Sequence, residues 1–539
     1  MSSEVTESNL GAPASAPQTC RPWLKSRDAS VESVYPVSAM PTDDAPAPFR
    51  IVLIAELLPR PQFALTHTAP TTPVPITRET FDEVMQRFSP SVALDLPNNP
   101  KPIEVTFSRL GAFRPEWLVK NVPALKVEPA PARAPAPTPA PGPKSLLDQL
   151  LDDIDDDTTP SAPRPPPARV ETRVANVLTH PEVRRLEAAW RGVKFVSDSY
   201  PRGAPVVLEV LHATPDTVTE ALELLQALPP TGTPVGLVVV DAVMGATARD
   251  CDRLIDWARG GESLRAPVVT NGTSELLGFD TLEALGTSSR GLAHSDDPRA
   301  ALFRTVAADD ASRWLVVAVN GLLARPRHSE STAREGVAVL EPKDLFFGAA
   351  YGVAALVAAS VHRTGAPFTH SGSTHGVLSN LPVRVTKVGA TERALSLEAG
   401  ARADSAEEAA KAGVAMFAAV QNRDVAILPV APVVFRGPST ASGTSRPASL
   451  TLGDQLFTAA AVSAVFGIAQ AIPPDTDAVA AREAAQVMLA AHLTFNGERA
   501  SCEVSIGASP PSLNVTVRPG RGAGVSVRDI SFVAPLGEA

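Results

Sequence analysis

Hydrophobic positions near the start of the chain predict a strand followed by a helix. The apolar, β-branched run FRIVLIAELL at residues 49–58 is typical of a strand that is buried on both faces. The segment ITRETFDEVMQRFSP at 76–90 places apolar residues at helical spacing, and Thr77 is positioned to cap such a helix. Its predicted buried stripe consists of Phe81, Val84, Met85 and Phe88.

The next segments complete a small folded unit. SVALDL at 91–96 and IEVTFSRL at 103–110 have the short, β-branched pattern of strands. The segment AFRPEWLVKNVPAL at 112–125 carries Pro115 near its start, and the first turn of a helix tolerates the missing N–H group of proline. Residues 49–125 are therefore predicted to form a small α+β unit.

A longer block, residues 170–539, alternates predicted helices and strands. HPEVRRLEAAWRGVKFV at 180–196 is interpreted as a helix followed by a strand, with Trp190 as a core residue. APVVLEVLHA at 204–213 and PVGLVVVDAV at 234–243 predict buried strands, and Ala- and Leu-rich helices lie between them. That alternation indicates an α/β layer.

The end of this block alternates with a period of two residues. ASCEVSIGA at 500–508, SLNVTVRP at 512–519 and GVSVRDISFVAP at 524–535 are separated by turn residues, which predicts an antiparallel meander. The predicted fold class is therefore α/β with α+β elements. A small α+β unit is tethered to a larger α/β domain that carries a C-terminal antiparallel β segment.

Proline separates these blocks, because the 53 prolines of the chain are concentrated in a few segments. Residues 1–48 are polar and proline-punctuated, and are interpreted as a flexible N-terminal arm. Residues 126–169 are rich in Pro and Ala, a composition that favours an extended tether.

Within this linker, residues 145–154 have the pattern of a short helix. Ser145 and Asp148 give a capping-box-like start. The apolar stripe of the predicted helix consists of Leu146, Leu147, Leu150, Leu151 and Ile154. A helix of about ten residues is marginal alone in water. The segment therefore either meets a partner or is a poorly ordered connection between domains.

Composition narrows the class of protein. The chain has 539 residues, of which 44% are hydrophobic, enough for two or three domains with real cores. The net charge of −10 and the pI near 5.5 argue against nucleic acid as the main partner. The N-terminal residues lack the pattern of a signal peptide, and no window reaches the roughly 18 to 20 uninterrupted apolar residues of a membrane span. We therefore expect a cytoplasmic protein with no membrane segment.

Motifs for common chemistry are not found in the sequence. Cys20, Cys251 and Cys502 lie far apart without C-x-x-C spacing, so neither a disulfide framework nor a zinc site is indicated. No G-x-S-x-G nucleophile elbow or GxxxxGK[ST] phosphate loop occurs. The glycine-rich RPGRGAG at 518–524 lies between two predicted strands and is interpreted as a hairpin turn.

Two further positions suggest chemistry only weakly. His370 and His375 lie five residues apart in a Gly/Ser loop that supplies no third ligand, so no metal site is expected there. Asp241 ends the apolar run GLVVVD, a position where α/β enzymes often place a catalytic carboxylate. Without a nearby base, cofactor loop or second acid, a helix cap or a surface group is the favoured interpretation. The residues thus predict no enzyme, no cofactor and no metal.

The small unit resembles the small subunit of the type VI secretion contractile sheath (TssB/VipA-like). That family has an opening PFR strand, an acidic helix of the form R-x-x-F-D-E-V-M and a closing F-R-P-x-x-L-V…V-P-x-L segment. These occur here in the same order as PFRIVLIAELLPR, TRETFDEVMQRFSPS and AFRPEWLVKNVPAL.

The longer block resembles the large subunit of the same sheath (TssC/VipB-like). The family segment H-P-x-x-x-x-L-E-x-x-W-R-G corresponds to HPEVRRLEAAWRG at 180–192. Weaker similarities follow in family order at RAPVV (265–269), NGLLARP (320–326) and GSTHGVLSNLP (372–382). The large half is shorter than usual for the family, and the loop at 436–449 has the composition of a flexible insert. The chain is therefore identified as a natural fusion of the small and large sheath subunits.

The resemblance implies a mechanical, non-enzymatic role. Family members form a helical homopolymer, linked by strand exchange, around a stack of hexameric inner-tube rings above a baseplate. Contraction of this polymer drives protein secretion. A head-to-tail contact that does not close generates such a filament, and extended arms can add strands to a neighbour's open sheet.

The resemblance also implies a use for the linker helix. In the family, an AAA+ unfoldase of the ClpV type binds a short helix near the start of the large subunit after contraction and recycles the subunits. Residues 145–154 lie where this element is expected. Three alternatives stay open: the helix packs permanently on the small unit, the chain is a non-polymerising adaptor or baseplate-associated scaffold, or it is an enzyme that uses Asp241 or the region of His370.

Overall fold

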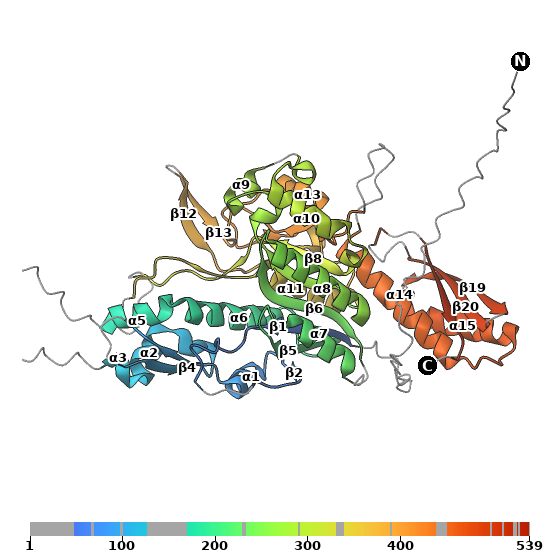
Figure 1. Cartoon of the computed structure of the whole chain (residues 1–539), viewed down its shortest axis with the longest axis horizontal. Helices are drawn as coiled ribbons and strands as arrows, with labels where there is room; N and C mark the ends of the chain where they lie inside the picture. Colours follow the sequence, from blue (N-terminus) through green and yellow to red (C-terminus); the bar gives the residue numbers. More distant parts are fainter. Residues whose placement is uncertain are drawn as a thin grey trace, which may run out of the picture.

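The structure is a computed structural model of the whole chain, drawn in Figure 1. It describes residues 48–65, 69–96, 101–126, 170–228, 233–288, 291–329, 339–388, 391–437, 450–495, 498–508, 511–520, 525–526 and 529–537. The predicted linker helix 145–154 and most of the predicted N-terminal arm, including Cys20, lie outside the described residues.

A seven-stranded sheet forms the centre of the protein, with the strand order β14-β8-β7-β6-β1-β5-β2. Its strands are β1 (Phe49–Ala55), β2 (Val74–Pro75), β5 (Val206–His212), β6 (Val235–Met244), β7 (Val268–Gly272), β8 (Leu315–Val319) and β14 (Val414–Met416). Every pairing in this sheet is parallel except that of β2 with β5. The predicted α/β class is confirmed.

Strand β1 occupies the centre of this sheet although it comes from the small unit at the start of the chain. It pairs in parallel with β5 on one side and with β6 on the other. Ile51 to Ile54 are at most 1% exposed, as the uniformly apolar sequence of the strand predicts. The small and large segments therefore share one sheet, and the linker joins two parts of a single layered body. The residue boundaries of the predicted domains stay predictions.

Helices cover both faces of the sheet. On one face, α7 (Val218–Ala227), α8 (Ala248–Leu264) and α10 (Pro298–Ala308) enclose a core with the alternate residues Val52 and Ile54 of β1. On the other face, α6 (Pro181–Asp198) and α11 (Ala349–Thr364) pack with Ile51 and Leu53. Successive side chains of a strand point to opposite faces, so each buried strand serves both cores.

The remaining elements of the small unit pack against α6 and α5 (Val170–Thr179). They are α1 (Phe81–Phe88), β3 (Ser91–Leu94), β4 (Ile103–Thr106), the 3-10 helix η1 (Leu110–Phe113), α2 (Pro115–Asn121) and α3 (Pro123–Lys126). The predicted stripe of α1 is buried, and Pro115 begins α2 as expected. The predicted cap is wrong: Thr80, not Thr77, precedes the helix, and the two threonines hydrogen-bond to each other.

Helix α6 corrects a second prediction. The segment 180–196 was expected to end in a strand, but the helix continues through it to Asp198. The β-branched residues Val193 and Val196 extend the buried stripe of Val183, Leu186 and Trp190 at three- and four-residue spacing. Tertiary packing of this stripe therefore overrides the local preference of valine for strands.

Smaller elements complete the body around the sheet. Two antiparallel pairs are β9 (Leu322–Arg325) with β10 (Leu345–Phe347) and β12 (Arg384–Val388) with β13 (Thr391–Leu395), and β11 (Val377–Leu378), β15 (Ala418–Ala419) and β16 (Ala426–Ile427) form a third small sheet. Further helices are η2 (Ser274–Leu277), α9 (Leu282–Thr287), η3 (Leu292–His294), η4 (Asp310–Trp314), α12 (Gly372–His375) and α13 (Ala403–Lys411). The hairpin β12–β13 projects from the body in Figure 1.

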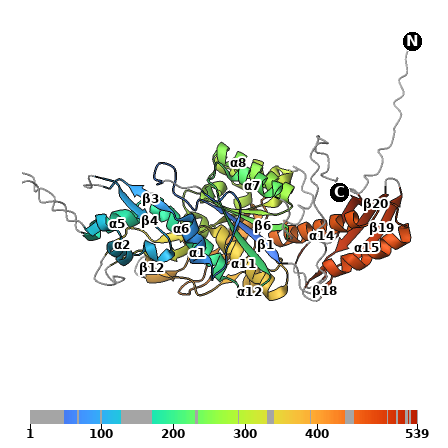
Figure 2. The same ribbon diagram turned by 90° about the horizontal axis from the view of Figure 1, so that it is seen from below.

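A C-terminal unit extends from one end of the body in both views (Figures 1 and 2). It contains α14 (Leu452–Ala471), α15 (Ala478–His492), the short pair β17 (Thr494–Phe495) and β18 (Glu498–Arg499), and the strands β19 (Ser501–Ala508), β20 (Pro511–Arg518) and β21 (Ile530–Pro535). The three long strands pair antiparallel in chain order, so the predicted meander is confirmed.

Helix α14 is long and apolar enough to cross a membrane by length and composition, the one such helix among the described residues. Its most apolar window is 67% buried within the protein. Packing in the core accounts for this composition, because a buried helix is apolar on all sides.

Candidate functional site

Strand β1, at the start of the small unit, lies at the point where the strand order of the sheet reverses. From β1 the chain moves outward to β5 on one side, and later to β6, β7 and β8 on the other. In doubly wound sheets, the carboxyl ends of the strands at this point leave a crevice in which ligands bind. Here helix α6 crosses that point and its side chains contact the loop that follows β1.

These contacts join the small and large segments. The indole N–H of Trp190 donates to the carbonyl of Leu57 at 3.1 Å. The Arg185 guanidinium donates to the carbonyls of Glu56 at 2.5 Å and Leu58 at 2.8 Å. It also pairs with the carboxylate of Glu56 at 3.1 Å. The loop after β1 is therefore held by α6 where other folds of this type hold a ligand.

Asp241 lies beside this junction, within β6. Its carboxylate accepts hydrogen bonds from the Tyr351 hydroxyl and from the Asn271 side-chain amide, both at 3.0 Å. Burial raises the pKa of Asp241 to about 6, although these two hydrogen bonds and the charge of Arg185 act to lower it. The expectation of a helix cap or a surface group is wrong. The run continues to Met244, so Asp241 is an interior position of the strand.

Gly192 allows the Tyr351 ring to reach this position. A Cβ atom added at Gly192 would lie 2.4 Å from ring carbons of Tyr351. Helices α6 and α11 therefore approach each other closely at this point. The glycine of the segment HPEVRRLEAAWRG thus has a packing role.

A buried cluster of charges joins the same helix to strand β9. Arg325 donates to both carboxylate oxygens of Glu187, at 2.7 and 2.8 Å, and to both oxygens of Glu341, at 2.5 and 2.9 Å. Burial acts to raise the pKa of Glu187, but hydrogen bonds from Arg325 and Arg191 hold it below the ordinary value. Glu187 and Arg325 belong to HPEVRRLEAAWRG and NGLLARP, so this ion pair joins the two segments.

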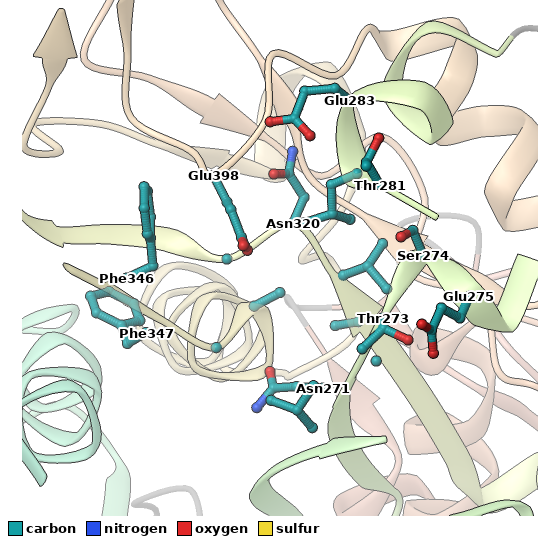
Figure 3. Close-up of a pocket in the computed structure, with 18 of the residues that line it drawn as sticks. Asn271, Thr273, Ser274, Glu275, Thr281, Glu283, Asn320, Phe346, Phe347 and Glu398 are labelled. Carbon is teal, nitrogen blue, oxygen red and sulfur yellow. The ribbon is translucent and has the colours of Figure 1, made fainter. Parts of the chain in front are cut away.

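A cavity of about 560 Å³ opens at the carboxyl ends of β7 and β8. Figure 3 shows Glu398 and Asn320 lying between Phe346 on one side and Ser274 on the other. The Asn320 side chain bonds to backbone atoms of Ala399 and Phe417, and the side-chain Oδ1 of Asn271 accepts from the N–H of Ala350. These amides hold backbone segments together at the wall of the cavity.

Acidic side chains give the cavity its charge. Burial and the nearby Glu283 raise the pKa of Glu398. Glu275 and Asp280 also line the cavity. Among the described residues, no group of three or more His, Cys, Asp or Glu side chains is arranged to hold a metal ion.

The two histidines considered from sequence do not form a site together. His370 is 1% exposed, its Nδ1 lies 2.8 Å from the carbonyl of Pro367, and burial lowers its pKa to about 4. His375 is exposed at the end of α12. The glycine-rich segment 518–524 does lie between paired antiparallel strands, β20 and β21, although residues 521–524 are outside the described residues.

The C-terminal sheet offers a surface of a different kind. Leu513, Val515 and Val517 of the central strand β20 are at most 1% exposed. The corresponding residues of β19, which are Cys502, Val504 and Ile506, are only partly buried. Strands β19 and β21 form the two edges of this three-stranded sheet. The edges carry unpaired backbone groups that can accept a further strand.

The predicted helix residues Leu146, Leu147, Leu150, Leu151 and Ile154 lie outside the described residues. Sequence reasoning did not find the contacts of Arg185 with the loop after β1, or the cluster of Glu187, Arg325 and Glu341. A signal was available for Arg325 and Glu341, because each directly follows an apolar run, and charges are seldom buried unless they are paired.

Comparison with sequence families gives two matches, in chain order. Residues 39–127 match the family described as Type VI secretion system, VipA. Residues 167–434 match VipB, described as the EvpB tail sheath N-terminal domain. No curated protein matches the chain. Strand β1 and helix α6 fall in different matched segments, so the junction described above is where the two similarities meet.

Proposed function

The chain belongs to the type VI secretion sheath, as a fusion of its VipA and VipB families, and we propose that it is the single-chain building block of a contractile sheath. Members of these families are structural proteins. In this proposal the chain polymerises around a hexameric inner-tube protein in the cytoplasm. Contraction of the polymer drives the inner tube outward, and the sheath itself performs no catalysis and uses no cofactor.

The placement of β1 is the observation that carries the proposal. The VipA-like segment supplies the central strand of the sheet, and the VipB-like segment supplies both of its neighbours. The two sheath components are thus parts of one rigid body with fixed stoichiometry. Such a body suits a repeating unit that must rotate as a whole while the polymer changes length.

The C-terminal sheet is the proposed connection between units. Its edge strand β19 has eight residues, and the inward-facing residues of that strand are incompletely covered. A strand from a neighbouring copy, added beside β19, would pair the free backbone groups and cover these side chains. The predicted N-terminal arm, residues 1–48, is the proposed donor. Because the same contact repeats from copy to copy without closing, it generates a helical filament.

Two further partners follow from the family. We propose that the first ring of units attaches to baseplate components. We also propose that an AAA+ unfoldase of the ClpV type binds the apolar stripe of the predicted linker helix after contraction. That stripe consists of Leu146, Leu147, Leu150, Leu151 and Ile154.

Electron microscopy of the full chain expressed with its inner-tube protein tests the proposal. We expect tubes of two distinct lengths and diameters, corresponding to extended and contracted states. Monomers or small closed rings alone would contradict polymerisation. They would favour the alternative of a sheath-fold adaptor or baseplate-associated scaffold.

The unfoldase contact has its own test. Leu147→Asp and Leu150→Asp place charges on the apolar stripe, and should abolish unfoldase binding while leaving the tubes intact. Asp148→Asn, which leaves every leucine in place, is the matched control. Undiminished binding to both leucine variants would contradict the assignment of this helix.

A further inference from the structure

A second groove lies next to the cavity of Figure 3, at the N-terminal end of α6. Its volume is about 790 Å³, and Phe346, Glu283 and Glu398 line both hollows. Five cationic side chains line this groove: Arg184, Arg185, Arg327, Lys343 and Arg384. Three acidic side chains, Glu283, Asp344 and Glu398, also line it, so cations are in excess here, whereas the cavity beside it is acidic.

Two of these cations are not neutralised within the described part of the chain. Arg185 pairs with Glu56 and Glu182, and Arg184 lies 3.7 Å from a Glu341 oxygen. The Arg327 guanidinium contacts only the carbonyl of Pro342, at 3.5 Å, and the Lys343 ammonium makes no ion pair with a described residue. Both side chains belong to exposed residues.

Arg384 completes the basic wall. Its guanidinium donates to the carbonyls of Leu397 and Glu398 and lies 3.9 Å from an oxygen of Asp344. It also lies 5.3 Å from the centre of the Phe346 ring. Arg327 and Lys343 are exposed, whereas Arg384 is partly buried, so Arg327 and Lys343 are the cations most accessible to an anionic ligand in the groove.

The groove also has an apolar part. Pro181, Ala188, Leu345 and Phe346 line it. Leu340, close in sequence to this lining, is 64% exposed. The groove therefore suits a ligand that is amphipathic and negatively charged, such as a segment with leucines on one side and carboxylates on the other.

We propose that residues 145–157 of the same chain bind in this groove. This segment contains six aspartates and no basic residue. Its leucines recur at helical spacing, so a helix would present them on one side with most of the aspartates beside or behind them. The leucines would contact the apolar part of the groove, and the aspartates would pair with Arg327 and Lys343. Pro181, the first residue of α6, lines the groove, and the N-terminus of this helix adds a further attraction for negative charge.

The length of chain allows this contact. Helix α5 has ten residues and leads from Val170 to Thr179 at the groove, a span of roughly 15 Å. Fifteen residues separate Ile154 from Val170. As a proline-rich extended chain they span up to roughly 45 Å, which is enough to return along α5. The tether also keeps the segment at high effective concentration near the groove, so a weak contact suffices.

Binding in the groove would cover the apolar stripe of the segment. This consequence rests on the proposed unfoldase function, but the contact itself does not. With the segment bound, the leucines are inaccessible to an unfoldase. When the segment is released, the leucines are exposed, and the segment stays joined to the rest of the chain at both ends.

Hydrogen–deuterium exchange on the unassembled full-length chain tests the contact. In the native chain we expect peptides covering 145–157 to exchange slowly. In Arg327→Glu/Lys343→Glu the same peptides should exchange about five- to tenfold faster, because two ion pairs become repulsions. Adding Asp152→Lys and Asp153→Lys to that variant should restore slow exchange.

A matched control and a mixing experiment complete the test. Arg482→Glu/Arg499→Glu changes two exposed arginines of the C-terminal unit and should leave the exchange of 145–157 unchanged. Fast exchange of 145–157 in the native chain, or slow exchange that persists in Arg327→Glu/Lys343→Glu, would overturn the proposal.

Mixing separates a contact within one chain from a contact between two copies. If the charge-swapped segment on one chain became protected only when a second chain supplied the Arg327→Glu/Lys343→Glu groove, binding within one chain would be overturned. Unfoldase binding is measured separately, with the Leu147→Asp variant. Failure of that assay alone would leave the exchange result intact and count only against the unfoldase function.

Discussion

The central sheet and the C-terminal sheet end in different ways. The outer strands of the central sheet are short, with two residues in β2 and three in β14, and β2 includes Pro75. The edges of the C-terminal sheet are longer, with eight residues in β19 and six in β21. Short edge strands and proline discourage the addition of another strand, whereas a long edge permits it. The comparison indicates that the edges of the central sheet resist the addition of a strand, whereas the edges of the C-terminal sheet permit it.

The two regions also differ in whether their ion pairs are buried or exposed. The body is held by buried charges and close helix contacts around α6, including Arg325 with Glu187 and Glu341. The outer face of the C-terminal sheet carries exposed pairs instead, such as Arg518 with Glu503 and Asp529. Exposed ion pairs contribute little to stability, and loss of one partner from a buried cluster is costly. Substitutions in the body should therefore change folding, and substitutions on the open sheet should change assembly.

The largest effect is expected at Arg325. Arg325→Met leaves Glu187 and Glu341 buried without their main partner, and should lower the free energy of unfolding by about 3 to 5 kcal/mol. Denaturant unfolding of the unassembled chain measures this loss. Arg518→Met, which breaks only exposed pairs, is the control and should change stability by less than about 1 kcal/mol. Equal losses in the two variants would remove the distinction between the regions.

Asp241 should make the stability of the body depend on pH. Its pKa is raised from 3.8 to about 6 in the folded protein, so the folded state binds this proton more tightly than the unfolded state does. The contribution is therefore most favourable below about pH 4 and is lost as the pH rises through about 6.

Asp241→Asn removes this ionisation and keeps an amide that can bond to Tyr351 and Asn271. At pH 8 it should stabilise the body by up to about 3 kcal/mol relative to the native chain, and the difference should vanish near pH 4. Thermal unfolding of both proteins from pH 4 to 8 provides the measurement. A difference that did not vary with pH would show that the pKa of Asp241 is the same in the folded and unfolded states, and would contradict the raised pKa.

Gly192 tests the close contact of α6 with α11. Gly192→Ala puts a methyl group 2.4 Å from the Tyr351 ring and should cost about 1 to 3 kcal/mol. Gly467→Ala in α14 is the matched control, because no described atom outside its chain neighbours and the nearby backbone of its own helix lies within 4 Å of its added Cβ. The control should be neutral or stabilising by up to about 1 kcal/mol, since alanine favours helix. Tyr351→Leu should partly rescue Gly192→Ala if the ring is the obstacle.

The smallest change in folding, with the largest change in assembly, is expected at β19. Ser501→Lys and Ser505→Lys alter exposed positions of this edge strand and should shift the free energy of unfolding by less than about 0.5 kcal/mol. Charge on an edge opposes strand addition, so tube formation should be lost in electron micrographs. Asn514→Lys on the central strand β20 is the control and should still form tubes. Tubes formed by the β19 variants would place the connection between units elsewhere.

Periodicity in the sequence predicted the local elements well. The apolar run at 49–58, the stripe of α1 and the alternation in β19, β20 and β21 all correspond to observed elements. Errors arose where a local pattern had two solutions. Val193 and Val196 suit a strand, but their spacing also continues the buried stripe of α6. Asp241 ended an apolar run in the sequence, but it is an interior residue of its strand.

The sequence by itself determined which segments are buried, where the chain turns, and which families it resembles. Tertiary structure alone decided that β1 lies between β5 and β6, and that Glu187 pairs with Arg325 across 138 positions of sequence. The physical reason is that periodicity records whether a face is buried but not which segment buries it. Strand partners and buried ion pairs depend on the geometry of the assembled layers, which no local pattern contains.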